Sequence, residues 1–477
     1  MFTPWLTAIR HPREVLVTDM VEKFALPLDG GSTSEGHVKL FRIYGRFETY
    51  FDTASSRIVR QVRPPMAVPE PARRRRTFLK TSAAVAAFST AGCLGLPGSS
   101  STDDDSPTDD SSTSNGVDEV EGVEIETVVD GLDHPWGLSF VPATSKLLVT
   151  ERGGRLTLVD TADGSLETVD GTPDVHAAGQ GGLLDVTIHP EFDDEPWVYL
   201  TYSALNDDGD STTHLGRGRL DIDEPELESF EELHAAEPYV DSNGHYGSRV
   251  VFGEDGMVYM TTGDRQFKDF GPEHVSQDTT NDLGSTLRLA PDGSIPADNP
   301  FVDEAEASDA LFSYGHRNPQ GMTVHPETGD LWVSDHGEQD GDELEIVERG
   351  GNHGWPIAHY GCTYGDGDPI GDDPHERDDV VDPVYHWECN SGGFPPAGMT
   401  FYDGDAFDDW QGDLFVGNLA GQYLGHFTVD GRDVEETEPL LADRGWRIRD
   451  VAVESESGHL YVAVDDGDAP IVRLHPE

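Results

Sequence analysis

Six pairs of short apolar runs recur between residues 118 and 477, and this repetition limits the possible folds more than any other feature of the chain. In each pair, a strand-like run leads through a turn to a second run that is rich in Val, Leu or aromatic residues. The pairs cover residues 137–140 with 147–150, 184–188 with 197–200, 249–252 with 257–260, 321–324 with 331–333, 398–401 with 414–416, and 449–453 with 460–463. Short paired strands without long helical periodicity are typical of propeller blades. The sequence therefore predicts an all-β fold, a six-bladed β-propeller over residues 118–477, because a β-sandwich explains the six-fold recurrence less well.

The charge of the chain limits its partners. Its 92 acidic and 31 basic residues give a formal net charge of −61. So few cations form no basic face for a nucleic-acid backbone, which excludes nucleic acid as a natural partner. An acidic, lysine-poor surface suits molar salt, where the Debye length is ~3 Å, so we hypothesise a halophilic source. Lysine occurs only at Lys23, Lys39, Lys80, Lys146 and Lys268.

A basic segment followed by a short apolar run indicates an export signal at residues 66–93. Residues 75–80, with the sequence RRTFLK, resemble the twin-arginine export motif, and residues 90–93 resemble a lipobox whose Cys93 receives a lipid. The apolar run at 83–88 is shorter than the ~20 residues that a membrane-spanning helix needs. Because such signals begin close to the initiator, Met66 is the expected start, and residues 1–65 are interpreted as a non-native or mis-annotated extension.

The segment after this signal is predicted to be a linker. Residues 94–117 are rich in Ser, Thr and Asp and lack the apolar residues that form a core, so we expect a flexible tether. A lipid anchor followed by a tether would place the globular part at the extracellular face of the cell membrane. The lipid would then be the only contact with the membrane.

Two further cysteines, Cys362 and Cys389, lie beyond this linker. In an oxidising compartment, two cysteines in one region indicate a possible disulfide. Two unpaired thiols are the alternative, because the sequence does not fix the distance between them.

Four loops that lead into the first strand of a repeat carry His, Arg, Asn and Gln in place of simple connecting residues. They cover residues 178–184, 243–249, 314–321 and 444–450. In a propeller these loops would all meet at the same end of the central channel. Such a convergence in one concavity indicates an active site.

The third loop and the segment after it suggest two kinds of ligand. Arg317 and Asn318 stand side by side, and the planar donors of arginine suit an anionic ligand such as a carboxylate. One short strand later, residues 334–343 are crowded with carboxylates, the oxygen ligands that Ca²⁺ prefers. A solvated acidic loop is the alternative for residues 334–343.

Several segments, in a shared order, resemble the soluble quinoprotein glucose dehydrogenases and aldose sugar dehydrogenases, which use pyrroloquinoline quinone (PQQ). The resemblance covers residues 130 to 475 and rests on residues 179–184, 287–300, 315–321, 350–356 and 447–451. It implies a six-bladed propeller that oxidises an aldose sugar at C1 to the lactone, by hydride transfer to the quinone. The electrons then pass to an acceptor that the sequence leaves unidentified.

The resemblance also implies roles for single residues. His245 matches the family's catalytic base, a task that suits an imidazole with a pKa near ~6.5. Arg317, Asn318, Arg447 and Arg449 match residues around the cofactor, and Arg317 would also favour the negative charge that develops on reduction. Further cofactor-lining positions are Gln180, His336 and Asp465.

The same resemblance implies two calcium sites and a substrate contact. Backbone carbonyls of Gly337 and Glu338 match the ligands of a cofactor-bound Ca²⁺, which acts as a Lewis acid on the quinone. Asp342 and Glu343 match a second, structural calcium site. Trp387 resembles a tryptophan of the substrate wall.

Two positions depart from the family pattern. Ala420 stands where the family has a lysine, and no lysine follows Lys268, so we expect the cofactor pocket to lack one cation. His336 replaces the glutamine of the glucose enzymes. Two other functions therefore stay open: a calcium-dependent propeller hydrolase such as a lactonase, and a non-catalytic binding module on the cell surface.

Overall fold

The computed structural model describes residues 38–40, 49–52, 57–60 and 122–477. The chain divides into two compact units, Met1–Pro107 and Thr108–Glu477. In the first unit, the strands β1 (Val38–Leu40), β2 (Thr49–Asp52) and β3 (Arg57–Arg60) form one antiparallel sheet in this order. The predicted export signal at 66–93 with its Cys93, and the linker at 94–117, lie outside the described residues.

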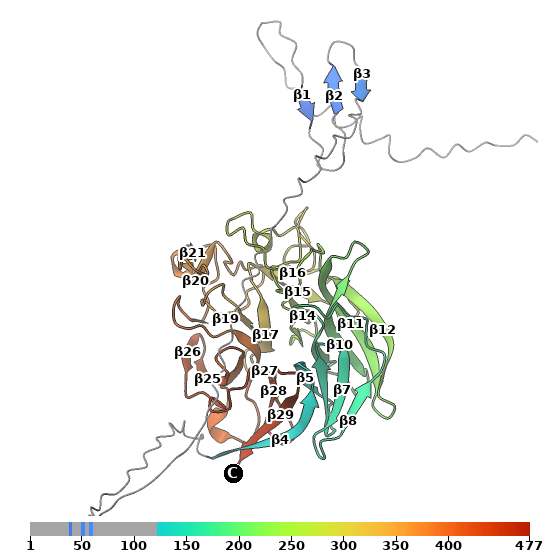
Figure 1. Ribbon diagram of the computed structural model, residues 1–477, viewed down its shortest axis with the longest axis vertical. Helices are drawn as coiled ribbons and strands as arrows, with labels where there is room; N and C mark the ends of the chain where they lie inside the picture. The colour runs from blue at the N-terminus through green and yellow to red at the C-terminus, as the bar shows by residue number, and fades with distance from the viewer. Residues whose placement is uncertain (1–37, 41–48, 53–56, 61–121) are drawn as a thin grey trace, which may run out of the picture. The chain divides into compact units, whose positions relative to one another are not determined.

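The second unit contains six four-stranded antiparallel sheets, which confirms the predicted six-bladed propeller (Figure 1). Each predicted pair of runs forms the first two strands of a blade. Blade 1 has β5 (Pro135–Phe140), β6 (Lys146–Glu151), β7 (Arg155–Asp160) and β8 (Leu166–Val169); blade 2 has β9 (Leu183–Ile188), β10 (Trp197–Leu205), β11 (Ser211–Asp221) and β12 (Glu226–Ala235); blade 3 has β13 (Val250–Phe252), β14 (Val258–Thr262), β15 (Ser285–Leu289) and β16 (Leu311–Tyr314). Blade 4 has β17 (Pro319–Val324), β18 (Leu331–Asp335), β19 (Glu343–Ile346) and β22 (Tyr385–His386); blade 5 has β23 (Pro396–Phe401), β24 (Leu414–Asn418), β25 (Tyr423–Asp430) and β26 (Asp433–Glu436); blade 6 has β27 (Ile448–Val453), β28 (Leu460–Val464), β29 (Ala469–Pro476) and β4 (Val123–Leu132).

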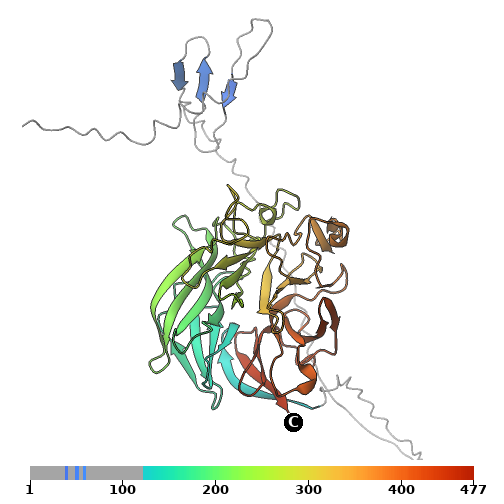
Figure 2. The same cartoon turned by 180° about the vertical axis from the view of Figure 1, so that it is seen from behind.

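The ring of blades closes through its sixth member. The amino-terminal strand β4 pairs with the carboxy-terminal strand β29, from Ala469 opposite Leu132 to Pro476 opposite Val123 (Figure 1). The first strand of each blade also contacts the first strand of both neighbouring blades, in the order β5, β9, β13, β17, β23 and β27. The two ends of the propeller are therefore joined by hydrogen bonds within one sheet. Figure 2 shows the propeller from behind.

The core lies between the faces of neighbouring blades. Leu147, Leu148 and Val149 of β6 are all fully buried, although successive side chains of a strand point to opposite faces. Both faces of the blade are therefore covered. The outermost strands β8 and β12 are largely exposed and carry glutamates, which protect an open sheet edge from pairing with another chain.

A few short elements complete the described residues. The hairpin of β20 (Ala358–Cys362) and β21 (Pro369–Gly371) lies between β19 and β22 in the chain. The helical segments are 3₁₀ turns, namely η2 (Val275–Gln277), η3 (Pro374–Glu376) and η4 (Asp408–Trp410). Within the part of the chain that the structure describes, no helix has the length and apolar character needed to span a bilayer.

A buried ionic cluster joins the inner strands of the propeller. The Arg249 Nη1 atom lies 2.9 Å from Asp185 Oδ1 and 3.0 Å from Asp450 Oδ1, and these residues come from blades 3, 2 and 6. Arg249 Nε also donates to the Gln320 carbonyl at 2.6 Å. Position 398 requires glycine, because a Cβ atom there would collide with the Asp450 carboxylate. Arg249 therefore holds four blades together rather than facing a ligand.

Candidate active site

A cavity of about 380 Å³ opens at the end of the propeller where the inner strands begin. It is lined by residues of all four predicted loops, so the expected convergence is found. Among the predicted site residues, those that line it are Gln180, His245, Arg317, Asn318, His336, Gly337, Arg447, Arg449 and Asp465.

Backbone contacts between loops of different blades bring these residues together. Gln180 N donates to the Asn243 carbonyl at 2.8 Å, and Gln180 Oε1 accepts from His245 N at 2.7 Å. Gly179 permits this approach, since it has a φ of 60° and a Cβ atom would strike Asn243. Asp264 N likewise donates to the Arg317 carbonyl at 2.7 Å. The blade 2, 3 and 4 loops thus form one connected wall.

His245 forms a hydrogen bond with Asp264, a residue that sequence reasoning did not single out. The His245 Nδ1 atom lies 2.6 Å from Asp264 Oδ1. Asp264 is held in turn by the Gln266 backbone N–H at 2.8 Å and by Trp355 Nε1 at 2.9 Å. Because Nδ1 is engaged by Asp264, Nε2 is the ring nitrogen left for a ligand in the cavity.

The surroundings of His245 keep its imidazole neutral. Burial lowers its pKa below the ordinary value; the hydrogen bond to Asp264 opposes this shift, and the charge of Arg317 adds to it. His245 also has a φ of 50°, in the left-handed region that residues with a side chain rarely adopt. Such strain is often found at functional sites. A neutral, fixed imidazole is the form that can accept a proton.

The opposite part of the wall is cationic. Arg449 Nη2 donates to Asp465 Oδ2 at 2.8 Å, and Arg449 Nη1 donates to Gln320 Oε1 at 2.8 Å. Arg447 Nη2 lies 3.4 Å from the same Asp465 oxygen. Among the described residues that line the cavity, five are Arg or Lys and one is acidic, which favours an anionic ligand.

Lys268 is one of these five cations, a lysine that sequence reasoning did not place at the cavity. Its Nζ atom lies 2.6 Å from Glu338 Oε1, and Arg317 Nη2 lies 2.5 Å from Glu338 Oε2. Burial raises the pKa of Glu338, but the hydrogen bond from Lys268 and the charge of Arg317 outweigh burial and lower it. The lysine comes from blade 3 and not from the position of Ala420 in blade 5.

Three buried nitrogen atoms at the cavity have no hydrogen-bond partner among the described residues: Arg317 Nε, Arg449 Nε and His336 Nε2. Buried donors and acceptors normally have partners, so this set indicates a polar ligand. Burial lowers the pKa of His336 well below its usual value, and Arg317 and His245 add to this effect. His336 is therefore neutral.

The predicted calcium ligands differ in what they contact. Gly337 lines the cavity. Asp342 lies behind it and accepts the backbone N–H groups of Gly337 at 3.0 Å and Phe394 at 2.8 Å. Chiefly because of burial, the pKa of Asp342 is raised to about 6. By contrast, Glu343 Oε1 is buried and has no hydrogen-bond partner among the residues that the structure describes. Because Asp342 already accepts two hydrogen bonds, Glu343 is the better candidate of the two carboxylates for a calcium ligand.

Trp387 does not line the cavity, and the structure corrects its assignment to the substrate wall. Its side chain is buried in the core of blades 4 and 5, stacked on Phe394 at 4.3 Å between ring centroids. Phe427 and Tyr385 also contact its ring. The exposed aromatic residue at the cavity is instead Tyr364, which lies in the β20–β21 hairpin.

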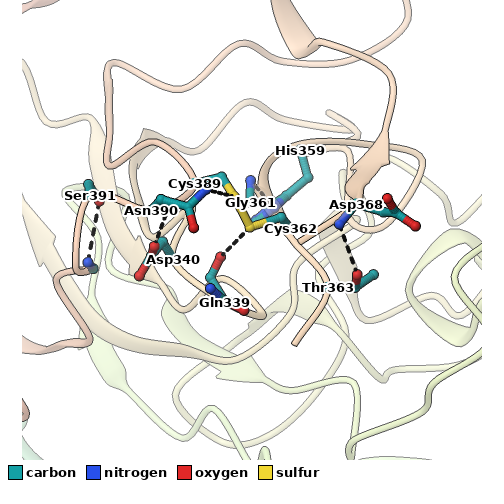
Figure 3. Close-up of a disulfide and its surroundings, with 11 residues drawn as sticks. Gln339, Asp340, His359, Gly361, Cys362, Thr363, Asp368, Cys389, Asn390 and Ser391 are labelled. Atoms are coloured by element: carbon teal, nitrogen blue, oxygen red, sulfur yellow. Dashed lines mark hydrogen bonds between the residues drawn. A yellow bond between two sulfur atoms is a disulfide. The ribbon is translucent and has the colours of Figure 1, made fainter. Parts of the chain in front are cut away.

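Cys362 and Cys389 form a disulfide in the structure (Figure 3). The two cysteines are 27 residues apart in sequence. Cys362 also pairs with Gln339 through backbone hydrogen bonds of 3.0 and 3.2 Å. The backbone pairing with Gln339 therefore holds the β20–β21 hairpin beside the loop that contains Gly337 and Glu338, and the disulfide joins this hairpin to the segment after β22.

Comparison with known proteins identifies the family of this chain. The profile of the Glucose / Sorbosone dehydrogenase family matches residues 132–473. The chain belongs to the glucose/sorbosone dehydrogenase family. Aldose sugar dehydrogenase YliI of Escherichia coli (strain K12) is 37% identical over 358 residues, which cover 74% of this chain and 93% of that protein. Membership of the family indicates an oxidoreductase.

Solved structures of related proteins have the same fold. The apo-form of the soluble aldose sugar dehydrogenase from Escherichia coli matches with a TM-score of 0.69 and 36% identity, over 74% of this chain and all (100%) of that one. The PQQ-bound form of the aldose sugar dehydrogenase from Streptomyces coelicolor matches with a TM-score of 0.61 and 25% identity, over 76% and 100%. A quinone-binding member of the family thus shares this propeller.

Some of the cavity residues were not predicted, although the sequence contained a signal for two of them. Asp264 and Lys268 follow β14, the second strand of blade 3. In an antiparallel blade the second strand ends where the first begins, so this loop had to lie beside His245. Tyr364 had no such signal, because the β20–β21 hairpin is an addition to its blade.

Proposed function

We propose that this protein oxidises an aldose sugar at C1 to the lactone, with PQQ and Ca²⁺ as cofactors. The observation that carries the proposal is the charge of the cavity. Five cationic side chains and one acid line it, in a chain with a net charge of −61. An anionic ligand beside a neutral, carboxylate-paired histidine is what a quinone-dependent sugar dehydrogenase requires.

The residues present fit a flat molecule with three carboxylates. Arg317, Arg447, Arg449 and Lys268 would hold its acidic groups, and Asn318 and Gln180 add polar contacts. The unpartnered nitrogens of Arg317 and Arg449 are the donors that such a ligand would satisfy. When bound, the quinone supplies the acceptor for the hydride that leaves C1 of the sugar.

His245 would take the proton of the sugar hydroxyl at C1 through Nε2. Asp264, 2.6 Å from Nδ1, would stabilise the imidazolium that forms and keep the ring in one orientation. Arg317 would stabilise negative charge that develops in the cavity, since it lines the same space. In this scheme the sugar would lose a proton to His245 and a hydride to the quinone, which together would account for a two-electron oxidation.

We also propose two calcium sites, as the family resemblance implies. Carbonyl oxygens of Gly337 and Glu338 would bind one Ca²⁺ at the cavity, where the ion would supply a Lewis acid for the quinone. Glu343 would provide a ligand for the second, structural ion, because its buried Oε1 atom has no partner within the described residues. Asp342 would support this loop through Gly337 and Phe394.

The proposed location is the extracellular face of the cell membrane, after twin-arginine export and lipidation of Cys93. A Cys93→Ser variant tests this part separately. It should move the protein from the membrane fraction to the medium or the soluble extracellular fraction. Unchanged fractionation of the variant would argue against the lipid anchor.

Reconstitution of the purified protein tests the function. Glucose and an artificial electron acceptor dye are added with PQQ and Ca²⁺, with PQQ alone, and with neither. Dye reduction that requires the quinone supports the proposal. Hydrolysis of a lactone without quinone would instead support a propeller hydrolase, and the absence of both activities would support a binding module.

A further inference from the structure

A second group of buried ionisable residues lies in blade 4, outside the cavity described above. His316 is in the loop between β16 and β17, Glu345 is in β19, and His353 follows β19. All three are buried, with exposed fractions of 0%, 1% and 3%. The rings of His316 and His353 stack, with 4.4 Å between their centroids and 22° between their planes.

Most of the facing atoms of this cluster, namely His316 Nδ1, Glu345 Oε2 and His353 Nδ1, have no hydrogen-bond partner within the described part of the chain. His316 Nδ1 lies 3.0 Å from Glu345 Oε2, and His353 Nδ1 lies 3.5 Å from Glu345 Oε1, yet neither pair has hydrogen-bond geometry. Both ring nitrogens of His353 are without a partner among the described residues. Buried polar atoms rarely stay unpaired, so a further occupant is indicated.

A proton on His316 would account for only part of this arrangement. The proton would pair His316 Nδ1 with Glu345, and His316 Nε2 already contacts Ser313 Oγ at 2.9 Å. It would leave His353 with two buried nitrogens and no partner. An ion that accepts one lone pair from each imidazole and from the carboxylate would give a partner to His316 Nδ1, to Glu345 and to one of the two His353 nitrogens, which is more than a proton on His316 provides.

The spacing of the cluster suits a small metal ion. One ligand atom from each residue can be chosen so that all three lie within 4.8 Å of one another. With Zn–N and Zn–O distances of about 2.0–2.1 Å, two ligands at a tetrahedral centre are roughly 3.3–3.4 Å apart. The two separations between imidazole and carboxylate, 3.0 Å from His316 Nδ1 to Glu345 Oε2 and 3.5 Å from His353 Nδ1 to Glu345 Oε1, bracket this value.

We propose that His316, Glu345 and His353 bind a divalent transition-metal ion, with Zn²⁺ as the closest match, at a buried site with three protein ligands. Two imidazoles and one carboxylate are ligands for this class of metal, whereas Ca²⁺ takes oxygen ligands. This site is therefore distinct in chemistry from the calcium sites proposed above. It does not depend on the proposed sugar oxidation.

The position of the cluster indicates that a bound ion would have a structural role. Asp335 Oδ2 lies 3.7 Å from His316 Nδ1, and the Asp335 carboxylate accepts the backbone N–H groups of Arg317 at 2.8 Å and Asn318 at 2.6 Å. The cluster thus lies directly behind the loop that brings these two residues to the cavity. A bound ion would stabilise that loop from behind.

Metal uptake by the full-length protein tests the proposal. The protein is stripped with a chelator, incubated with Zn²⁺ in the presence of excess Ca²⁺, passed through a desalting column and analysed by elemental mass spectrometry. We expect one retained Zn²⁺ per chain, and an at least 100-fold weaker Zn²⁺ affinity for His353→Ala. The control His375→Ala removes a histidine whose side chain is 82% exposed, and it should retain the ion.

Two further measurements keep the test decisive if His353→Ala is poorly folded. Glu345→Gln changes the carboxylate without a change in volume and should also lose the ion. Co²⁺ added to the stripped wild-type protein should give the visible absorption of a tetrahedral centre with nitrogen ligands. Absence of retained Zn²⁺, displacement by Ca²⁺, or equal retention by His353→Ala and His375→Ala would each overturn the proposal.

Discussion

The Nδ1 atom of His245 lies 2.6 Å from Oδ1 of Asp264, and both side chains are buried. The two residues lie before the first and after the second strand of blade 3, β13 and β14. Asp264 is fixed by Trp355 and by the Gln266 backbone. This pair gives the cavity a histidine with a defined orientation and one free nitrogen.

Asp264→Asn should lower kcat by a factor on the order of 10²–10⁴, because the amide no longer stabilises a protonated His245. In the wild type, burial lowers the pKa of His245, so the acid limb of the kcat/KM profile should lie below the ordinary histidine value of about 6.5. The hydrogen bond that His245 Nδ1 donates to Asp264 opposes that shift. Its loss should therefore move the acid limb to still lower pH. Asp269→Asn, an exposed acid of the same loop, is the matched control, and an unchanged pH profile in Asp264→Asn would contradict this role.

Lys268→Ala should weaken PQQ binding about tenfold, which corresponds to ~1.4 kcal/mol. The variant loses one cation of the cavity and leaves Glu338 paired with Arg317 alone. The salt dependence of binding should also become less steep. Titration of the quinone by fluorescence measures both effects. Lys146→Ala, which removes a lysine paired with Asp160 in blade 1, should bind like the wild type.

Arg249→Met should reduce the free energy of unfolding by about 3–5 kcal/mol, since it leaves two buried carboxylates without their cation. The pKa of Asp185 is already raised to about 6, chiefly by burial. Chemical denaturation measures the loss. Arg219→Met breaks an exposed pair with Glu195 and should change stability by less than ~1 kcal/mol. A similar effect of both substitutions would show that the cluster is not a structural centre.

Cys389→Ser should lower the stability of the oxidised protein by about 2–4 kcal/mol, because the disulfide closes a loop with a 27-residue separation. The β20–β21 hairpin should become more accessible to protease as its link to Gln339 weakens. Denaturation with and without a reductant checks this outcome. Reductant should destabilise the wild type and leave the variant unchanged, whereas equal responses would argue against the bond.

The propeller could be predicted from the sequence because each blade repeats the same pair of apolar runs. The convergence of Gln180, His245, Arg317 and Arg447 followed from the fold, since each lies before or at the start of an inner strand. Local patterns of sequence were sufficient for both inferences.

Other features depend on contacts between distant segments. Trp387 was expected at the substrate wall, but it packs on Phe394 and Phe427, which only the folded chain brings to it. Lys268 was not recognised as a cavity residue because the family position is Ala420, in a different blade. Charge in a cavity depends on which side chains reach it, and not on their order in the chain.

The central claim is that the cationic cavity binds an anionic quinone next to His245. Equilibrium titration of PQQ into the calcium-loaded protein, at low and high salt, tests it most directly. The account predicts one quinone per chain, weaker binding as salt rises, and binding by His245→Ala within about threefold of the wild type while kcat falls by a factor on the order of 10²–10⁴. Absence of saturable quinone binding, or an unaffected rate in His245→Ala, would contradict it.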